Sequence, residues 1–187
     1  MLIDFVKENA SPDVTFVGEF NLSTDPLDID DEVRQMCEQN LCGYYGRNWC
    51  CPPYTPPCST CRMILSKYTH MILVRTTFER KDLFDIEEMA SHSRAHGKFA
   101  RELREKLRGI EGLDFMMLSA GGCGVCKECT CPDEKCRFPK ERMFSIESYG
   151  IQITTFLTGH GISCRAGNDE QSYFLIVFFN KPVDTIS

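Results

Sequence analysis

The chain has 187 residues, of which 42 % are apolar, aromatic or cysteine and 26 % are charged, and its formal net charge at pH 7 is -6. This balance is typical of a globular protein and excludes extensive disorder. The chain lacks the clustered lysines and arginines that grip a phosphate backbone, so we expect no nucleic-acid partner. No run approaches the ~20 apolar residues of a membrane span and no secretion signal is visible, so we expect a cytoplasmic protein that does not enter a membrane.

Patterning along the chain predicts strands and helices in alternation. We expect strands at residues 14–20, 71–77, 114–119, 151–157 and 173–179; short helices at 59–67 and around 140–148; and one long amphipathic helix at 83–108, bent near Gly97. The last strand is almost continuously apolar, which is typical of a strand that is covered on both faces and central to its sheet.

These elements indicate a fold of the α+β or α/β class, with a mixed β-sheet packed against helices and the cysteine-rich loops at the edge of the sheet. We predict a single domain over residues 1–187. A weak two-fold repeat is suggested by half-units at 30–80 and 112–160, joined by the long helix. In each, a cysteine loop and a short helix lead through Tyr68 or Tyr149 into a strand.

Twelve cysteines are far more than packing requires in a chain of this size. Six lie between Cys37 and Cys61, five lie between Cys123 and Cys136, and Cys164 stands alone. A cytoplasmic compartment does not favour disulfides, so a disulfide framework is the minority interpretation. Metal ligation is therefore the leading explanation of the two cysteine segments.

The first segment winds tightly around several thiols. Its cysteines are Cys37, Cys42, Cys50, Cys51, Cys58 and Cys61, separated by glycines and prolines. Cys58 and Cys61 have the spacing that lets two thiolates reach one metal or cluster from a single turn. Cys51 precedes a proline, as in ferredoxin cluster motifs. Cys50 is equally compatible with simple packing, because free cysteine is among the most buried residue types.

The second segment contains the most specific motif of the chain. Cys123, Cys126 and Cys129 form a C-x2-C-x2-C run, whose three thiolates can hold one face of an iron-sulfur cubane, and Cys136 or Cys131 would supply the fourth. Zinc sites more often pair C-x2-C with a distant second pair. We therefore favour 4Fe-4S clusters, two in number, with zinc as the alternative.

Other candidate residues carry weaker signals. His92 and His96 have the i, i+4 spacing of helical zinc ligands but lack the adjacent glutamate of the metalloprotease motif, and His160 lies in a predicted loop that could approach the second segment. Cys164 has no neighbouring base. Phosphate loops, dinucleotide fingerprints and serine triads are not visible, so we expect no catalytic site beyond the metal centres.

Linked motifs resemble a known family. Cys37, Cys42, Tyr45-Gly46 and Cys51-Pro52-Pro53-Tyr54 precede the C-x2-C-x2-C run, which leads to Cys136-Arg137-Phe138-Pro139, Ser145-Ile146-Glu147 and Gly150-Ile151. Over residues 30–180 this arrangement resembles the predicted metal-binding proteins of domain-of-unknown-function family 2284, found mainly in anaerobic bacteria and archaea. The resemblance implies metal binding, with ligands Cys37, Cys42 and Cys51 in the first half and Cys123, Cys126, Cys129 and Cys136 in the second. Cys50, Cys58, Cys61 and Cys131 depart from the family pattern.

Three functions follow from these assignments. The first is an electron carrier or redox subunit with one cluster on Cys37, Cys42, Cys51 and either Cys58 or Cys61, and another on Cys123, Cys126, Cys129 and Cys136. The acidic chain would then meet a redox partner with a basic face. The second is an enzyme or activator with an open iron position at the first segment. The third is a zinc-stapled structural or interaction module.

Overall fold

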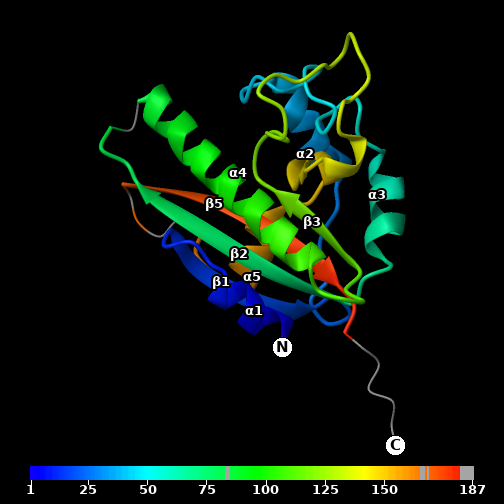
Figure 1. Ribbon diagram of the computed structural model, residues 1–187, viewed down its shortest axis with the longest axis vertical. Coiled ribbons are helices and arrows are strands. Elements are labelled where there is room, and N and C mark those ends of the chain that lie inside the picture. The colour runs from blue at the N-terminus through cyan, green and yellow to red at the C-terminus, as the bar shows by residue number, and fades with distance from the viewer. Residues whose placement is uncertain (83–84, 165–166, 168, 182–187) are drawn as a thin grey trace, which may run out of the picture.

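The computed structural model describes residues 1–82, 85–164, 167 and 169–181, and Figure 1 shows its arrangement. The α-helices of this part of the chain are α1 (Leu2–Glu8), α2 (Asp31–Met36), α3 (Cys58–Leu65), α4 (Ile86–Arg108) and α5 (Ile153–Gly159). The strands are β1 (Val14–Asn21), β2 (His70–Glu79), β3 (Phe115–Ser119), β4 (Phe144–Ser145) and β5 (Glu170–Phe179). Single 3-10 turns are η1 (Cys37–Gln39), η2 (Pro139–Glu141) and η3 (Glu147–Tyr149).

The strands form one mixed sheet in the order β1-β2-β5-β3-β4. The pairs β1·β2, β2·β5 and β3·β5 are antiparallel, whereas β3 and β4 are parallel. The predicted α+β class with a mixed sheet is confirmed, and the predicted central position of the last strand is also confirmed, because β5 lies between β2 and β3.

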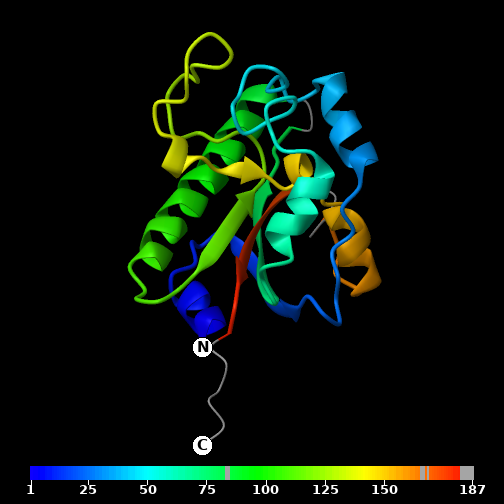
Figure 2. The same cartoon turned by 90° about the vertical axis from the view of Figure 1, so that its right-hand side faces the viewer.

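Helices cover both faces of this sheet, as Figure 2 shows with the sheet seen nearly edge-on. Ile72, Val74, Leu175 and Val177 point into a core with α1 and α4. Their strand neighbours Met71, Leu73, Phe174, Ile176 and Phe178 point the other way, into a core with α3, α5 and η3. Successive side chains of a strand alternate between faces, so a strand buried on both sides needs apolar residues at almost every position. That requirement explains the unbroken apolar runs of β2 and β5.

The long helix α4 begins directly after its N-cap residue, Asp85. The Asp85 carboxylate accepts hydrogen bonds from the backbone N–H groups of Glu87 and Glu88, both at 2.9 Å, which satisfies donors that a helix N-terminus leaves free. Phe99, Leu103 and Leu107 form the buried stripe. The helix is continuous through Gly97, and residues 83–84 of the predicted helix lie outside the described residues.

Two predicted elements are wrong. Residues 151–157 were expected as a strand, but α5 occupies Ile153–Gly159 because Ile153, Phe156 and Leu157, spaced as on one helical face, all reach the core. Residues 140–148 were expected as a helix. They form η2, β4 and the start of η3 instead, since Phe144 and Ser145 pair with the free edge of β3.

The structure does not confirm the two-fold repeat. The first half-unit leads through Tyr68 into β2, whereas the second leads through Tyr149 into α5. In the part of the chain that the structure describes, none of the helices has both the length and the apolar character that crossing a lipid bilayer requires.

Gly150 provides a test of this packing, because it has a φ of +74° and lies against the start of α3. A Cβ at this position would come within 2.5 Å of Cys58 Sγ and 2.7 Å of the Asp30 carbonyl oxygen. Gly112 has the same φ of +74° but no heavy atom within 4 Å of its ideal Cβ, so it is a matched control.

We expect Gly112→Ala to lower the free energy of unfolding by about 1 kcal/mol, the cost of a left-handed backbone. Gly150→Ala adds overpacking and should cost about 1–3 kcal/mol more. Urea denaturation of both variants measures the difference. Equal destabilisation by the two substitutions would contradict the close approach at Gly150.

Candidate metal centre

Both cysteine segments lie side by side at one end of the sheet, as Figures 1 and 2 both show. The indole Nε1–H of Trp49 donates a hydrogen bond to the Glu134 carbonyl oxygen at 3.1 Å. The Cys131 thiol lies 3.8 Å from the Gly46 carbonyl oxygen. The ring of Tyr44 lies against Gly122, where an ideal Cβ would be only 2.9 Å from it. These contacts join two loops that are far apart in the sequence.

A cavity of about 1020 Å³ lies between α4 and the loop of residues 120–138, and we call it the thiol cavity. Six cysteines line it: Cys50, Cys123, Cys126, Cys129, Cys131 and Cys136. All four residues predicted as second-site ligands are in this set, together with Cys50 from the first segment. Soft thiol donors in such a number suit an iron-sulfur cluster or zinc.

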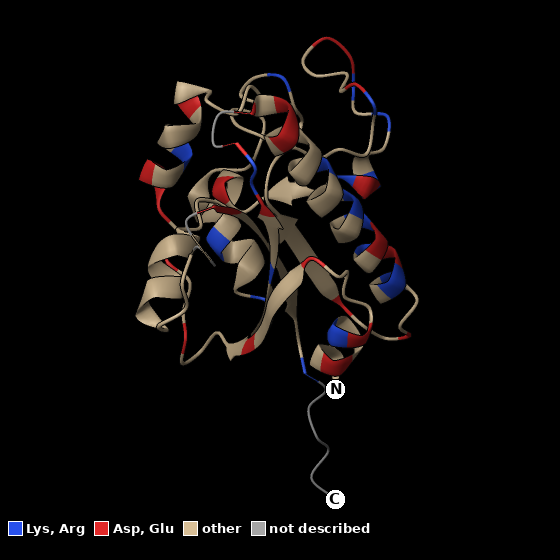
Figure 3. Ribbon diagram, turned by 90° about the vertical axis from the view of Figure 1, so that its left-hand side faces the viewer, with Lys and Arg blue, Asp and Glu red and all other residues tan. Residues whose placement is uncertain are grey.

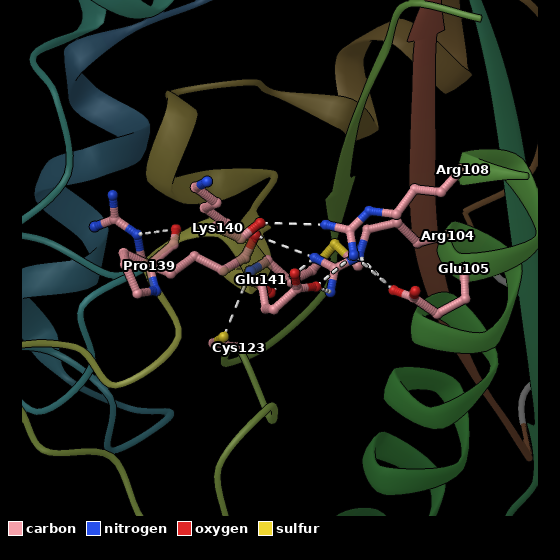
Figure 4. Close-up of polar contacts among 9 residues, drawn as sticks. Arg104, Glu105, Arg108, Cys123, Pro139, Lys140 and Glu141 are labelled. Carbon is pink, nitrogen blue, oxygen red and sulfur yellow. Dashed lines mark hydrogen bonds and ion pairs between the residues drawn. The ribbon is translucent and has the colours of Figure 1, made fainter. Parts of the chain in front are cut away.

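Cys123 lies at the centre of the local hydrogen bonding. Its sulfur accepts the backbone N–H of Met143 at 3.4 Å, drawn in Figure 4. A hydrogen bond from the Cys50 thiol, joined by backbone N–H donors of Met143 and Val125, lowers the pKa of Cys123 to about 6. The same contact raises the pKa of Cys50, which is 1 % exposed. The loop is therefore built to favour a negative sulfur at position 123.

Arg104 of α4 adds a positive charge on the same side. Its side chain is only 8 % exposed, and it donates to the Glu141 carbonyl oxygen at 2.8 Å and pairs with the Glu141 carboxylate at 3.2 Å. Arg108 and Glu105 complete this network, as Figure 4 shows. The network ties η2 to α4, and the charge of Arg104 also lowers the pKa of Cys123.

The first segment forms a second group of thiols. Cys51 is buried, Cys37 is half-buried and Cys42 is exposed. Burial, followed by the nearby Cys42, Cys37 and Glu147 in that order, raises the pKa of Cys51 to about 12. Glu147, on η3, also raises the pKa of Cys37. The carboxyl of Glu147 thus lies beside the predicted first-site ligands, which the sequence reasoning did not foresee.

The adjacent residues Cys50 and Cys51 belong to different groups. The thiol of Cys50 forms a hydrogen bond with Cys123. The thiol of Cys51, by contrast, has its strongest electrostatic interactions with Cys42 and Cys37. Neighbouring Cα atoms are ~3.8 Å apart. The two thiol groups are therefore adjacent in space and joined through one peptide bond.

Cys58 and Cys61 lie elsewhere. Both are 0 % exposed and belong to the core beneath α3. The thiol of Cys58 donates to the Asp30 carbonyl oxygen at 3.6 Å, and that of Cys61 donates to the Pro56 carbonyl oxygen at 3.5 Å. Burial raises the pKa of both thiols, most clearly that of Cys61, to about 11. This placement favours packing, while their ligand role stays a prediction from spacing.

The remaining candidates have partners of their own. His96 is 1 % exposed, bonds through Nδ1 to Thr76 and through Nε2 to Ser119, and stacks on Tyr173. His92 stacks on Phe78. His160 pairs with Asp25 at 2.9 Å rather than approaching the second segment. The Cys164 thiol lies 3.9 Å from the Thr154 carbonyl oxygen.

Across residues 1–82, 85–164, 167 and 169–181, no three side chains of His, Cys, Asp or Glu converge closely enough to hold a metal ion. The thiols are gathered in two groups, but they are not arranged at bonding distance around a common point. Binding of a single metal ion therefore requires the cysteine side chains to move together, whereas in an iron-sulfur cluster each thiolate binds its own iron atom.

The fold and these thiol groups define a cysteine-rich α+β protein with two adjacent sets of soft donors. The chain belongs to the family described as predicted metal-binding protein (DUF2284), whose pattern matches residues 21–179. No curated protein and no solved structure matches the chain. Metal binding is thus the family's expected property, and the site residues are assigned from the chain's own geometry.

His96 helps to fix the start of the cysteine loop, because its Nε2 forms a hydrogen bond with Ser119, the last residue of β3 before that loop. Burial lowers the pKa of His96 to about 4. The unfolded chain, with an ordinary histidine pKa near 6.5, binds this proton first as pH falls. Stability from neutral His96 is therefore complete above pH ~6.5 and is lost progressively as pH falls toward ~4.

We expect the free energy of unfolding of the wild-type protein to fall by about 2 kcal/mol more than that of His96→Gln between pH 7 and pH 5. Urea denaturation at several pH values checks this difference. His160→Gln is the control, since its pKa is raised and not lowered. Parallel pH profiles for wild type and His96→Gln would rule out a buried neutral histidine.

Proposed function

We propose that this protein binds two 4Fe-4S clusters at adjacent sites and acts as an electron carrier or redox subunit. The observation that carries the proposal is the separation of Cys50 and Cys51 into two neighbouring thiol groups at one end of the sheet. Two groups of thiols, joined through one peptide bond, suit electron transfer between two centres.

The donor set fits such clusters. Cys123, Cys126, Cys129 and Cys136 would hold one, and Cys37, Cys42 and Cys51 would hold the other. When bound, a cluster of this type takes up and releases single electrons. The amide N–H groups at Cys123 and the positive charge of Arg104 stabilise negative sulfur there, and such contacts tune the potential of a centre.

A second candidate function is favoured by the first thiol group. Cys58 and Cys61, the predicted sources of its fourth thiolate, lie in the core and hydrogen-bond to carbonyl oxygens. A cluster on three thiolates leaves one iron position for an exchangeable ligand, with the carboxyl of Glu147 nearby. This arrangement suits a cluster-dependent enzyme or activator.

The net charge of the chain supports one proposal about a partner. Because the chain has a formal net charge of -6, a redox partner would meet it with a basic face.

We expect protein purified without oxygen to be brown and to contain about eight iron and eight acid-labile sulfide per chain, the content of two 4Fe-4S clusters. Dithionite should produce an electron paramagnetic resonance signal of reduced clusters. Iron, zinc and sulfide analysis of the same sample measures this. Near-stoichiometric zinc without sulfide would overturn the redox function and favour the zinc-stapled module.

Single substitutions should separate the two sites. Cys126→Ser and Cys37→Ser should each lose about four iron per chain. Cys61→Ala should retain the full iron content and lose only about 1–2 kcal/mol of unfolding free energy, because it opens a small cavity in the core. Iron analysis and urea denaturation measure the two effects. Loss of about four iron in Cys61→Ala would instead assign Cys61 to the first cluster.

A further inference from the structure

The charge of the thiol cavity is opposite in sign to that of the chain. The whole sequence has 27 acidic and 21 basic residues. The cavity, however, is lined by six basic residues (Arg47, Arg94, Lys98, Arg101, Lys127 and Arg142) and two acidic ones (Glu128 and Asp133). Positive charge is thus concentrated around the thiol cavity although the chain as a whole is acidic. Figure 3 shows Lys and Arg both along α4 and in the loop of residues 120–138.

One wall of the cavity is a face of α4 that carries both long cationic side chains and small residues. Arg94, Lys98 and Arg101 follow one another at i, i+4 and i+7, so they project from the same side of α4. Ala90, Ser93 and Gly97 line the cavity between them. Small side chains at these positions leave space above the helix, while the long cationic side chains border it.

Arg101 reaches across this space to the cysteine loop. Its Nη1 lies 3.2 Å from an ideal Cβ on Gly97 and 2.7 Å from one on Gly124, which sits between Cys123 and Cys126. A side chain at either glycine would crowd the guanidinium. Gly124 also has a φ of +63°, which L residues rarely adopt. Backbone and glycine placement therefore make room for this cation beside the thiols.

These cations are largely unengaged. Within the described residues, the side chains of Arg94 and Arg101 form no ion pair or hydrogen bond, and Lys98 has only an exposed ion pair with Glu102 at 3.7 Å. Arg104, outside the cavity lining, already supplies positive charge to Cys123. The guanidinium groups of Arg94 and Arg101 are therefore available to a ligand, and guanidinium is suited to carboxylate and phosphate groups.

We propose that the thiol cavity binds a small anion with carboxylate or phosphate groups, held by Arg94, Lys98 and Arg101 beside the cysteine loop. The cavity volume of about 1020 Å³ is just above the ~300–1,000 Å³ range of small-molecule sites, which leaves room for an anion next to a metal centre. The placement of the anion next to a cluster rests on the proposed function. Binding of the anion depends only on the cations.

The test uses the full chain purified without oxygen and calorimetric titration in a zwitterionic buffer of low ionic strength. Citrate and inorganic pyrophosphate are the probes, one for carboxylate and one for phosphate recognition. We expect one-to-one binding of at least one probe. Affinity should fall as sodium chloride is raised from ~50 to ~200 mM, because salt screens exposed charges.

The double variant Arg94→Gln/Lys98→Gln should weaken binding about tenfold or more, since two charge-assisted contacts are lost. Lys106→Gln is the matched control, because Lys106 is an exposed cation of α4 that does not line the cavity. Its affinity should stay within about twofold of wild type, as expected for a distant surface charge. Both substituted positions in the double variant are exposed, so we expect it to fold.

Two results would overturn the anion site: neither probe binds one-to-one, or the double variant binds as tightly as Lys106→Gln. Electron paramagnetic resonance of the reduced protein tests the placement next to a cluster. A saturating probe should shift the cluster signal in wild type and not in the double variant, and an unchanged wild-type signal would refute that placement. If the protein contains zinc and no sulfide, the titration still tests the anion site while the redox function fails.

Discussion

The position of the thiols depends on the pairing of β5 with β2 on one side and β3 on the other. Ile176 of β5 lies opposite both Leu73 of β2 and Leu118 of β3. Because both faces of β5 are covered, a slip of one residue would exchange the side chains of the two cores, so the register is strongly specified. The end of β3 at Ser119 is therefore fixed beneath α4, and the cysteine loop must start there. The cysteines of the second segment are therefore placed by the end of β3.

Burial and charge then act on the thiols in opposite directions. In the first group, burial and then the neighbouring thiols raise the pKa of Cys51 to about 12. At Cys123 the Cys50 thiol, two backbone N–H donors and Arg104 together outweigh burial, and the pKa falls to about 6. The two groups are adjacent yet electrostatically different. Two similar clusters placed in them would meet different surroundings, which is one way in which proteins separate the potentials of neighbouring centres.

The distribution of charge also reconciles an acidic chain with a cationic site. Net charge describes the field that a protein presents at long range, whereas a ligand inside a cavity responds to the side chains that line it. The acidic residues of α4 are Glu87, Glu88, Glu102 and Glu105, and none of them lines the cavity. Arg94, Lys98 and Arg101 of the same helix do line it. A basic partner surface and an anionic small ligand are thus compatible with the same molecule.

Local patterns in the sequence were sufficient for β1, β2, β3 and β5, for the long helix and for the class of metal-binding protein. Alternation, apolar runs and the C-x2-C-x2-C spacing are properties of neighbouring residues, so they can be recognised before any folding is known. They failed at residues 151–157, where a β-branched stretch forms α5, because packing against the core outweighed local propensity. They failed again at residues 140–148, where the edge of β3 offered a partner for β4.

The sequence by itself determined that this chain gathers thiols in two segments and belongs among metal-binding proteins. Only the tertiary structure placed Cys50 beside Cys123 and buried the thiols of Cys58 and Cys61 in the core. It also decided that Glu147 and the arginines of α4 face these groups. The reason is physical, because contacts between residues many positions apart depend on sheet register and helix packing, and spacing along the chain does not record them.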